Sequence, residues 1–277
     1  MPELPEVETV RRGLEARILG ARVVRAEARR TDLRIPLQRG FARRLAGRRV
    51  ERIERRAKYL LLRLDDGHCL VVHLGMSGRL IVGEPGEDGA LAKHAHVILR
   101  FDNGRRVVFE DHRRFGLMTL IPNDALKSHA LFRHLGPEPL DDRFDGPALA
   151  RLLAGRRTPL KAALLDQTRV VGVGNIYASE ALHRAGLSPK RPARTVTGPR
   201  AARLAEAIRA TLADAIAAGG SSLRDYVQAS GELGYFQHAW RVYDREGEAC
   251  PTTGCAGRIR RLVQSNRSTF HCPVCQR

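Results

Sequence analysis

The first six residues, Met1-Pro2-Glu3-Leu4-Pro5-Glu6, combine a potential nucleophile with two carboxylates. Methionine before proline is normally removed, which predicts Pro2 as the mature terminus with a secondary amine. An α-amino group has a pKa near ~8 against ~10.4 for lysine, so roughly a tenth of it is free base at pH 7. Its attack on an aldehyde-like carbon gives an iminium ion, an electron sink that promotes elimination from an attached sugar.

Glu3 and Glu6 are three residues apart and share one face of the predicted opening helix. Beside a nucleophile, such carboxylates suit general acid–base catalysis. Acidic residues are also favoured in any first helical turn by the helix dipole. The spacing alone favours this second explanation.

A second group of reactive side chains lies near the end of the chain, in the pattern Cys250-x4-Cys255-x16-Cys272-x2-Cys275. Two close cysteine pairs separated by a hairpin-length insert predict a tetrahedral zinc site. Four thiolates leave no position for water, so we expect one structural zinc ion and no catalytic metal. Reduced or disulfide-linked cysteines are the alternative. The insert predicts strands 258–264 and 268–271, with residues 265–267 at the turn.

The elements that must position these groups follow from the hydrophobic pattern. Val7, Val10, Leu14 and Ile18 recur at helical spacing, and Pro5 suits a first helical turn. From about residue 22 to 121 the chain is typical of antiparallel β-structure in a sandwich or barrel. The candidate strands are 59–64, 69–74, 97–101, 106–110 and 117–121.

The later part of the chain is helical. Residues 176–185 predict a short helix, and Leu204, Ile208, Leu212 and Ile216 form a stripe that Gly219 ends. The prediction is therefore an α+β protein. Its predicted parts are an N-terminal β-sandwich domain with an N-terminal helix at 1–130, a linker at 131–146, a helical domain at 147–240 and a cysteine hairpin at 241–277.

The charge of the chain favours a polyanionic partner. Lys and Arg total 48 against 30 Asp and Glu, a formal charge of +18, which is typical of nucleic-acid binding. A general preference for Arg is the alternative, since only five of the basic residues are Lys. RNA binding would give the same charge pattern. Neither a run of about 18 apolar residues nor a signal-peptide pattern is present, so we expect a cytoplasmic protein that does not bind membranes.

Several motifs, in order along the chain, resemble those of bacterial formamidopyrimidine-DNA glycosylases. They are the opening segment 2–9, His73-Leu74-Gly75-Met76-Ser77-Gly78, Asp111-His112-Arg113-Arg114-Phe115-Gly116, residues 172–178 (GVGNIYA) and the cysteine hairpin. The resemblance implies a β-sandwich, a helix–two-turns–helix domain and a zinc hairpin. It also implies excision of 8-oxoguanine and formamidopyrimidines from duplex DNA, followed by β,δ-elimination at the abasic site. The expected form is a monomer that joins the nucleoid when it is bound to DNA.

The resemblance assigns roles to individual residues. Pro2 would attack C1′ of a nucleotide flipped from the stack. Glu3 would act as the acid, Glu6 would be a second catalytic carboxylate beside it, and Lys58 would transfer protons. Arg267 would assist the second elimination. Residues that would contact DNA are Lys58, His73, His94, Arg113, Arg157, Asn175 and Arg267.

Two further sets follow from the resemblance. Met76, Arg113 and Phe115 would fill the space that the flipped nucleotide leaves. Residues 220–223, with Ser221 and Ser222, resemble a mobile loop that closes over the flipped base.

The chain departs from the family pattern at two places. The first cysteine pair is spaced by four residues where two are common, and Asn266 replaces a glycine, although Asn tolerates the same left-handed backbone. Two other functions stay open. One is an endonuclease VIII-like glycosylase for oxidised pyrimidines, against which Leu4 and the gap-filling set argue. The other is a zinc-hairpin DNA-binding protein without enzymatic activity.

Overall fold

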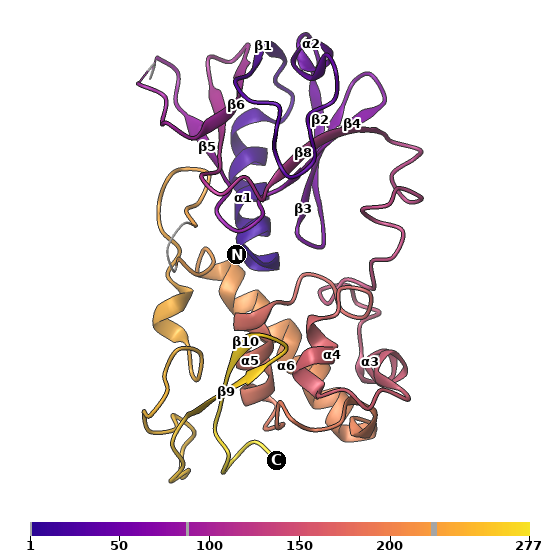
Figure 1. Cartoon of the computed structure of the whole chain (residues 1–277), viewed down its shortest axis with the longest axis vertical. Helices are drawn as coiled ribbons and strands as arrows, with labels where there is room; N and C mark the ends of the chain where they lie inside the picture. The colour runs from indigo at the N-terminus through magenta and orange to yellow at the C-terminus, as the bar shows by residue number, and fades with distance from the viewer. Residues whose placement is uncertain (1, 87–88, 223–225) are drawn as a thin grey trace. The chain divides into compact units, whose positions relative to one another are not determined.

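A computed structural model of the chain describes residues 2–86, 89–222 and 226–277. Two predictions fall on residues outside these ranges. Removal of methionine concerns Met1, and the predicted mobile loop includes Leu223. The chain divides into two compact units (Figure 1). The first joins Met1–Arg133 with Ala218–Gln237, and the second joins His134–Ala217 with His238–Arg277.

The first unit holds two four-stranded antiparallel sheets, in the orders β1-β6-β7-β5 and β2-β3-β4-β8. Figure 1 shows α1 running between them. The elements of this unit are α1 (Leu4–Ile18), β1 (Val23–Ala28), α2 (Phe41–Leu45), β2 (Val50–Arg56), β3 (Tyr59–Leu64), β4 (His68–His73), β5 (Arg79–Gly83), β6 (Ala95–Phe101), β7 (Arg106–Glu110) and β8 (Leu117–Pro122).

Helix α1 is part of the core of this unit. Its stripe of Val7, Val10, Leu14 and Ile18 is at most 1% exposed and joins the inward side chains of both sheets. Burial of each such side chain is worth roughly 1.5–3 kcal/mol. Because the helix begins at Leu4, this packing also holds the N-terminus of the chain in place.

A smaller core lies on the outer face of the sheet β2-β3-β4-β8. Leu61, Cys69, Val71 and Ile121 point outward from β3, β4 and β8, and the segment 123–133 covers them with its own apolar side chains. Burial raises the pKa of the Cys69 thiol to about 12. Cys69 is therefore an unreactive core residue.

The second unit is built around the longest helix, α6, against which α3 and α5 pack. A two-stranded hairpin contacts α5 through its second strand. The elements are α3 (Gly146–Leu153), α4 (Leu160–Leu165), α5 (Asn175–Arg184), α6 (Gly198–Ala217), β9 (Arg260–Gln264) and β10 (Arg267–His271), with short 3-10 helices at Ala193–Thr195 and Phe236–Ala239.

The hairpin turn is tighter than the sequence predicts. Ser265 and Asn266 have φ values of 48° and 58°, as a two-residue type I′ turn requires. Arg267 pairs with Gln264 as the first residue of β10, so its prediction as a turn residue is wrong. The left-handed turn that Asn266 allows places Arg267 beside the tip.

Some of the other predicted elements agree with the structure, and several elements were not predicted. Strands β3 and β7 coincide with the predicted ranges 59–64 and 106–110, and the α+β class is confirmed. Strands β1, β2 and β5 and the short helices α2, α3 and α4 had no predicted range of their own. Segment 218–237, placed by the predicted bounds in the helical domain, groups with the first unit here. None of the described helices is both long and apolar enough to span a membrane.

Candidate active site

The N-terminal segment is buried. Pro2 is buried, and Glu3 and Glu6 are 3% and 2% exposed. The backbone N–H of Glu3 donates to Oε2 of Glu6 at 2.7 Å, and the N–H of Ser221 donates to Oε1 at 2.8 Å. Both oxygens of Glu6 thus accept from backbone, which orients the first turn of α1 and joins it to Ser221.

The described part of the predicted mobile loop is anchored at its start. Gly220 has a φ of +83°, and a Cβ there would lie 3.1 Å from Oε1 of Glu6, so only glycine suits this approach. The hydroxyl of Ser222 donates to the carbonyl of Tyr226 at 2.9 Å and accepts from the N–H of Gly234 at 2.8 Å. These bonds hold the base of the loop beside the N-terminal segment.

Lys58 lies in the two-residue turn between β2 and β3, after Ala57 with a φ of 53°. It is 7% exposed. A surface lysine is therefore excluded, and burial of this rarely buried residue type is informative. The turn therefore places the primary amine of Lys58 at the end of the β2–β3 hairpin.

His73 lies close to Lys58 in the sheet. It pairs across the strands with Tyr59, and the two rings are 4.8 Å apart. Burial, with the charges of Lys58 and Arg34, lowers the pKa of His73 to about 4. Its Nδ1 accepts from the N–H of Gly75 at 3.0 Å, so the neutral ring carries its proton on Nε2 and can donate it to an anion.

Two large apolar side chains are exposed on neighbouring loops of this unit. Met76 is 39% exposed and Phe115 is 45% exposed. The guanidinium of Arg113 lies 4.8 Å from the centre of the Phe115 ring, a cation–π distance. The structure thus presents together the side chains that the sequence predicts as gap-filling.

Asp111 joins these two loops from beneath. It is 0% exposed and accepts from the hydroxyl of Ser77 and from the N–H of Gly116 at 2.7 Å. A Cβ at Gly75 would lie 2.4 Å from the carbonyl carbon of Phe115, so the loops meet backbone to backbone. The motif containing Asp111 was recognised in the sequence, but this positioning role was not.

His94 lies beside the same loops. Its ring is exposed and 6.2 Å from the ring of His112. Its carbonyl accepts from the N–H of Asp111 at 3.1 Å. Within the first unit, the predicted residues therefore form two groups, one around the N-terminus and one on the exposed loops.

In the second unit, Asn175 begins α5 and its side chain is bonded on both sides. Its Oδ1 accepts from Nζ of Lys161 at 2.7 Å, and its Nδ2 donates to the carbonyl of Ser268 at 3.0 Å and to the hydroxyl of Tyr243 at 3.2 Å. The amide therefore joins the helix to the hairpin. The helix N-terminus, through its backbone N–H groups, is the part suited to an anion.

Lys161 is 1% exposed and also donates to Ser268 and Thr269 of β10. Glu180, on α5, accepts from the N–H groups of three consecutive residues, Arg241–Tyr243, at 2.8–3.0 Å. Burial raises the pKa of Glu180, against the effect of these three bonds. The two residues fix the chain before and within the hairpin, whereas Arg157 and Arg267 are exposed.

The four hairpin cysteines form a single group whose sulfur atoms all lie within 4.8 Å of one another. The Sγ atoms of Cys250 and Cys275 are 3.7 Å apart, as are those of Cys255 and Cys272. A regular tetrahedron with metal–sulfur bonds of ~2.3 Å has edges of ~3.8 Å. The group can therefore hold a metal ion, and none of the four cysteines is in a disulfide.

Sequence reasoning missed the positioning roles of Lys161 and Glu180. One signal was present. The chain uses Arg almost throughout, and Lys161 is one of five lysines and lies in the apolar run LKAALL. An isolated Lys among apolar helical residues indicates a buried, bonded ammonium. Glu180 has no such signal, because its partners are backbone groups about 60 residues away.

Comparison with known proteins agrees with this geometry. Residues 1–118 match the formamidopyrimidine-DNA glycosylase N-terminal domain, and residues 135–227 match the formamidopyrimidine-DNA glycosylase H2TH domain. The chain is 56% identical to the formamidopyrimidine-DNA glycosylase of Paracoccus denitrificans and 57% identical to that of Beijerinckia indica, with 100% of each chain covered.

Solved structures match equally well. The Fpg protein of Thermus thermophilus has a TM-score of 0.87 at 42% identity, over 99% of this chain and 98% of that one. A Lactococcus lactis Fpg mutant in complex with Fapy-dG-containing DNA has a TM-score of 0.90 at 34% identity, with 100% of both chains covered. The chain belongs to the formamidopyrimidine-DNA glycosylase family.

Proposed function

We propose that this protein is a bifunctional DNA glycosylase and AP lyase that excises oxidised purines from duplex DNA. The observation that carries the proposal is the N-terminal segment. A buried Pro2 precedes Glu3, whose backbone is held by Glu6. Relatives at 34% identity are solved with DNA that contains Fapy-dG or an abasic site, which supports this class of substrate.

In the proposed reaction, the secondary amine of Pro2 attacks C1′ while the glycosidic bond breaks and the base leaves with a proton. Glu3 supplies an acid for base departure and sugar ring opening, and Lys58 transfers protons during elimination. The iminium ion makes the C2′–H acidic, and as this proton is removed a C2′=C3′ double bond forms and the 3′ phosphate leaves with the electron pair of its C–O bond. In the second elimination the C4′ proton is removed and the 5′ phosphate leaves in the same way, with Arg267 assisting.

Glu6 has a different role in this proposal. Its two oxygens accept from Glu3 and Ser221, so it positions the first turn of α1 and the base of the loop. Ser221 and Ser222 would anchor the loop that is proposed to close over the flipped base. Glu6 is thus a positioning residue rather than the acid itself.

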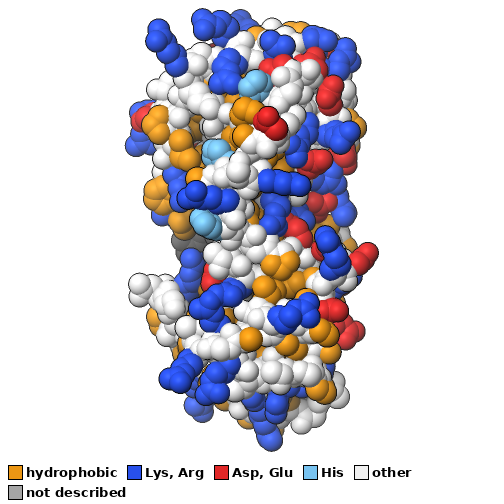
Figure 2. Space-filling view, turned by 90° about the vertical axis from the view of Figure 1, so that its right-hand side faces the viewer, with side chains coloured by type: hydrophobic (Ala, Val, Ile, Leu, Met, Phe, Trp, Pro, Cys, Tyr) orange, Lys and Arg blue, Asp and Glu red, His pale blue; other side chains and the backbone are white. Residues whose placement is uncertain are grey.

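Basic side chains of each unit would contact the DNA backbone. Figure 2 shows Lys and Arg side chains spread over the face that it draws, with fewer Asp and Glu side chains among them. Phosphate contacts are assigned to Lys58, Arg157 and Arg267, to the Nε2–H of His73 and to the α5 N-terminus at Asn175. His94 would lie near the backbone beside the exposed loops.

The exposed loops would fill the gap in the stack. Phe115 offers a ring face or edge, Met76 offers a flexible apolar chain, and Arg113 offers donors to the unpaired cytosine. Large apolar side chains exposed together on a surface indicate a contact site. This group favours lesions opposite cytosine.

The metal in the cysteine group is proposed to be one zinc ion. The sulfur spacing and the four-thiolate set suit it, and a closed coordination sphere makes it structural. The zinc ion would stabilise a hairpin that has only a small core, and so keep Arg267 in position to contact DNA.

The function is tested by incubating the protein with duplexes that contain 8-oxoguanine:C or thymine glycol:A. Faster cleavage of the first, with 3′- and 5′-phosphate ends at the gap, is expected. Faster cleavage of the second would assign the chain to the endonuclease VIII-like alternative. Binding without cleavage of either would assign it to the non-enzymatic alternative.

A further inference from the structure

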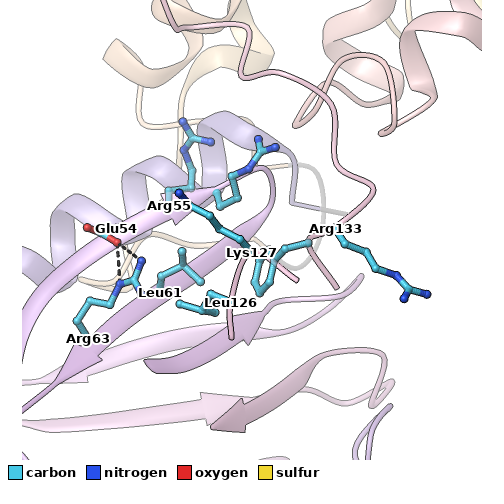
Figure 3. Close-up of a pocket in the computed structure, with 9 residues that line it drawn as sticks. Glu54, Arg55, Leu61, Arg63, Leu126, Lys127 and Arg133 are labelled. Carbon is cyan, nitrogen blue, oxygen red and sulfur yellow. Dashed lines mark hydrogen bonds and ion pairs between the residues drawn. The ribbon is translucent and has the colours of Figure 1, made fainter. Parts of the chain in front are cut away.

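The outer face of the first unit carries a cavity that the proposed function does not use. It lies at the β2 edge of the sheet β2-β3-β4-β8 and has a volume of about 520 Å³. Figure 3 shows the Glu54–Arg63 pair at one end and Arg133 extending away at the other, with Leu61 and Leu126 between them. The lining residues are Glu54, Arg55, Arg56, Leu61, Arg63, Leu126, Lys127, Phe132 and Arg133.

The floor of the cavity is apolar and held in place. Leu61 and Leu126 are each 6% exposed and belong to the smaller core. The half-buried ring of Phe132 packs against Tyr59 edge-to-face, with the ring centres 5.1 Å apart. The cavity is the space between β2 and segment 123–133, and its apolar floor can accommodate an apolar group.

The rim of the cavity is cationic. Five of the nine lining residues are Lys or Arg and one is acidic. That acid, Glu54, is already paired with Arg63 at 2.8 Å. Lys127 and Arg133 are exposed at the mouth, so the charge offered to solvent is positive.

We propose that this cavity binds an acidic peptide segment that carries one large apolar side chain. The apolar side chain would enter between Leu61, Leu126 and Phe132, because burial of such an anchor supplies most of the affinity of a small interface. Carboxylates on either side of the anchor would meet Lys127 and Arg133, which gives selectivity and a faster association.

The lining favours a peptide over nucleic acid. A DNA phosphate would use only the cationic rim and leave the floor empty. A stacked base needs an accessible aromatic face, whereas Leu61 and Leu126 are aliphatic and Phe132, the single aromatic lining residue, already packs against Tyr59. An acidic peptide with an apolar anchor uses the floor and the rim together.

The test uses the full protein and three fluorescein-labelled peptides, followed by fluorescence anisotropy. The first peptide has three acidic residues on each side of a central Phe, the second has Ser in place of Phe, and the third has Lys in place of the acids. The protein variants are Lys127→Glu/Arg133→Glu at the mouth and, as a matched control, Arg39→Glu/Arg43→Glu. Both control residues are exposed and lie in or next to α2.

The first peptide is expected to bind, and the mouth variant is expected to weaken it about tenfold, since two charge contacts become repulsive. The control variant should change its affinity by less than about twofold. The Ser peptide should bind about tenfold more weakly because the anchor is lost, and the Lys peptide should not bind. The mouth variant should cleave 8-oxoguanine:C duplexes as the unmodified protein does.

Four results would overturn this inference. The first is that the protein does not bind the first peptide, and the second is that it binds the Ser peptide with the same affinity. The third is that the control variant weakens peptide binding as much as the mouth variant does. The fourth is that the mouth variant, but not the control variant, loses affinity for a labelled single-stranded oligonucleotide. The last would assign the cavity to nucleic acid. Duplex cleavage is measured separately, so failure of the proposed function is distinguishable from failure of this site.

Discussion

The Nζ of Lys161 lies 2.7 Å from Oδ1 of Asn175, and the same ammonium donates to Ser268 and Thr269 of the hairpin. One buried cation thus joins the start of α5 to the strand that begins with Arg267. The two phosphate-binding elements proposed for the second unit are therefore positioned by a residue that is itself inaccessible to DNA.

Replacement of Lys161 by Met is expected to disturb both elements. Met fills a similar volume but leaves buried acceptors without their donor, at a cost of about 1–3 kcal/mol in the free energy of unfolding of this unit. Affinity for abasic duplex should fall, and the slope of log K against log[salt] should decrease by about one phosphate contact. Trp240, the one tryptophan of the chain, lies in this unit and reports its unfolding.

Lys190→Met is the matched control for that experiment, because Lys190 is exposed. It should leave the tryptophan unfolding transition within about 0.5 kcal/mol of the unmodified protein. If Lys161→Met kept both the affinity and its salt slope, the positioning role of Lys161 would be wrong.

Asp111→Asn is expected to separate two activities. The amide has one acceptor oxygen where the carboxylate accepts from Ser77 and Gly116, so the loops carrying Met76 and Phe115 lose part of their support. Excision from 8-oxoguanine:C duplex should fall about 10- to 100-fold, as for a small misplacement of binding groups. Trapping on single-stranded abasic DNA should be kept, because no gap in a duplex needs filling there.

The control for Asp111→Asn is Asp124→Asn, which changes a carboxylate of the same unit that lies outside the loop contacts. It should leave both activities unchanged. An equal loss of both activities in Asp111→Asn would indicate general damage to the unit rather than loss of loop support.

The protonation of His73 is measurable by NMR. Burial and the charges of Lys58 and Arg34 lower its pKa to about 4, so the ring should stay neutral through pH 7 and bind its proton only near pH 4. Nitrogen chemical shifts should show the Nε2–H tautomer. Lys58→Gln removes a positive charge and should raise this pKa, though not to 6.5, because burial remains.

A titration midpoint of His73 at 6.5 or above would contradict this environment. The lowered pKa of His73 also determines how the free energy of unfolding changes with pH. An unfolded chain binds the proton near pH 6.5, so His73 lowers the free energy of unfolding as the pH falls from 6.5 toward 4, by at most about 3 kcal/mol. His73→Gln should remove this part of the pH dependence.

The sequence predicts the first helix and strands β3 and β7 closely, because their apolar residues recur at the period of the element. It also predicts the cysteine group, because the spacing of the four cysteines along the chain is visible in the sequence itself. Strands β1 and β2 are harder, because Arg and Glu interrupt them, as in VERIERR. Their pairing depends on register with distant strands, which a single segment does not reveal.

The site residues also fall into those that the sequence predicts and those that it does not. Pro2, Met76, Arg113 and Phe115 belong to motifs that can be read directly. The supports of these residues, such as Asp111 beneath the exposed loops and Ser221 on Glu6, depend on hydrogen bonds between residues up to 215 positions apart. No local pattern encodes such a bond, so only the structure assigns these roles.

Removal of the metal is expected to affect the second unit selectively. One zinc per chain should be found by elemental analysis, and its removal by a chelator should abolish binding of abasic duplex, because the hairpin that carries Arg267 loses its support. The β-sheet signal of the first unit in circular dichroism should persist. Full affinity in a metal-free protein, or a metal other than zinc in native material, would contradict the zinc assignment.

Borohydride reduction of the protein mixed with abasic duplex, followed by intact-mass analysis and peptide mapping, identifies the nucleophile directly. One covalent adduct is expected, on the nitrogen of Pro2, in a chain that lacks Met1. Pro2→Gly, with a primary amine, should trap less. An adduct on Lys58, or full excision by a chain that keeps Met1, would show that Pro2 is not the nucleophile.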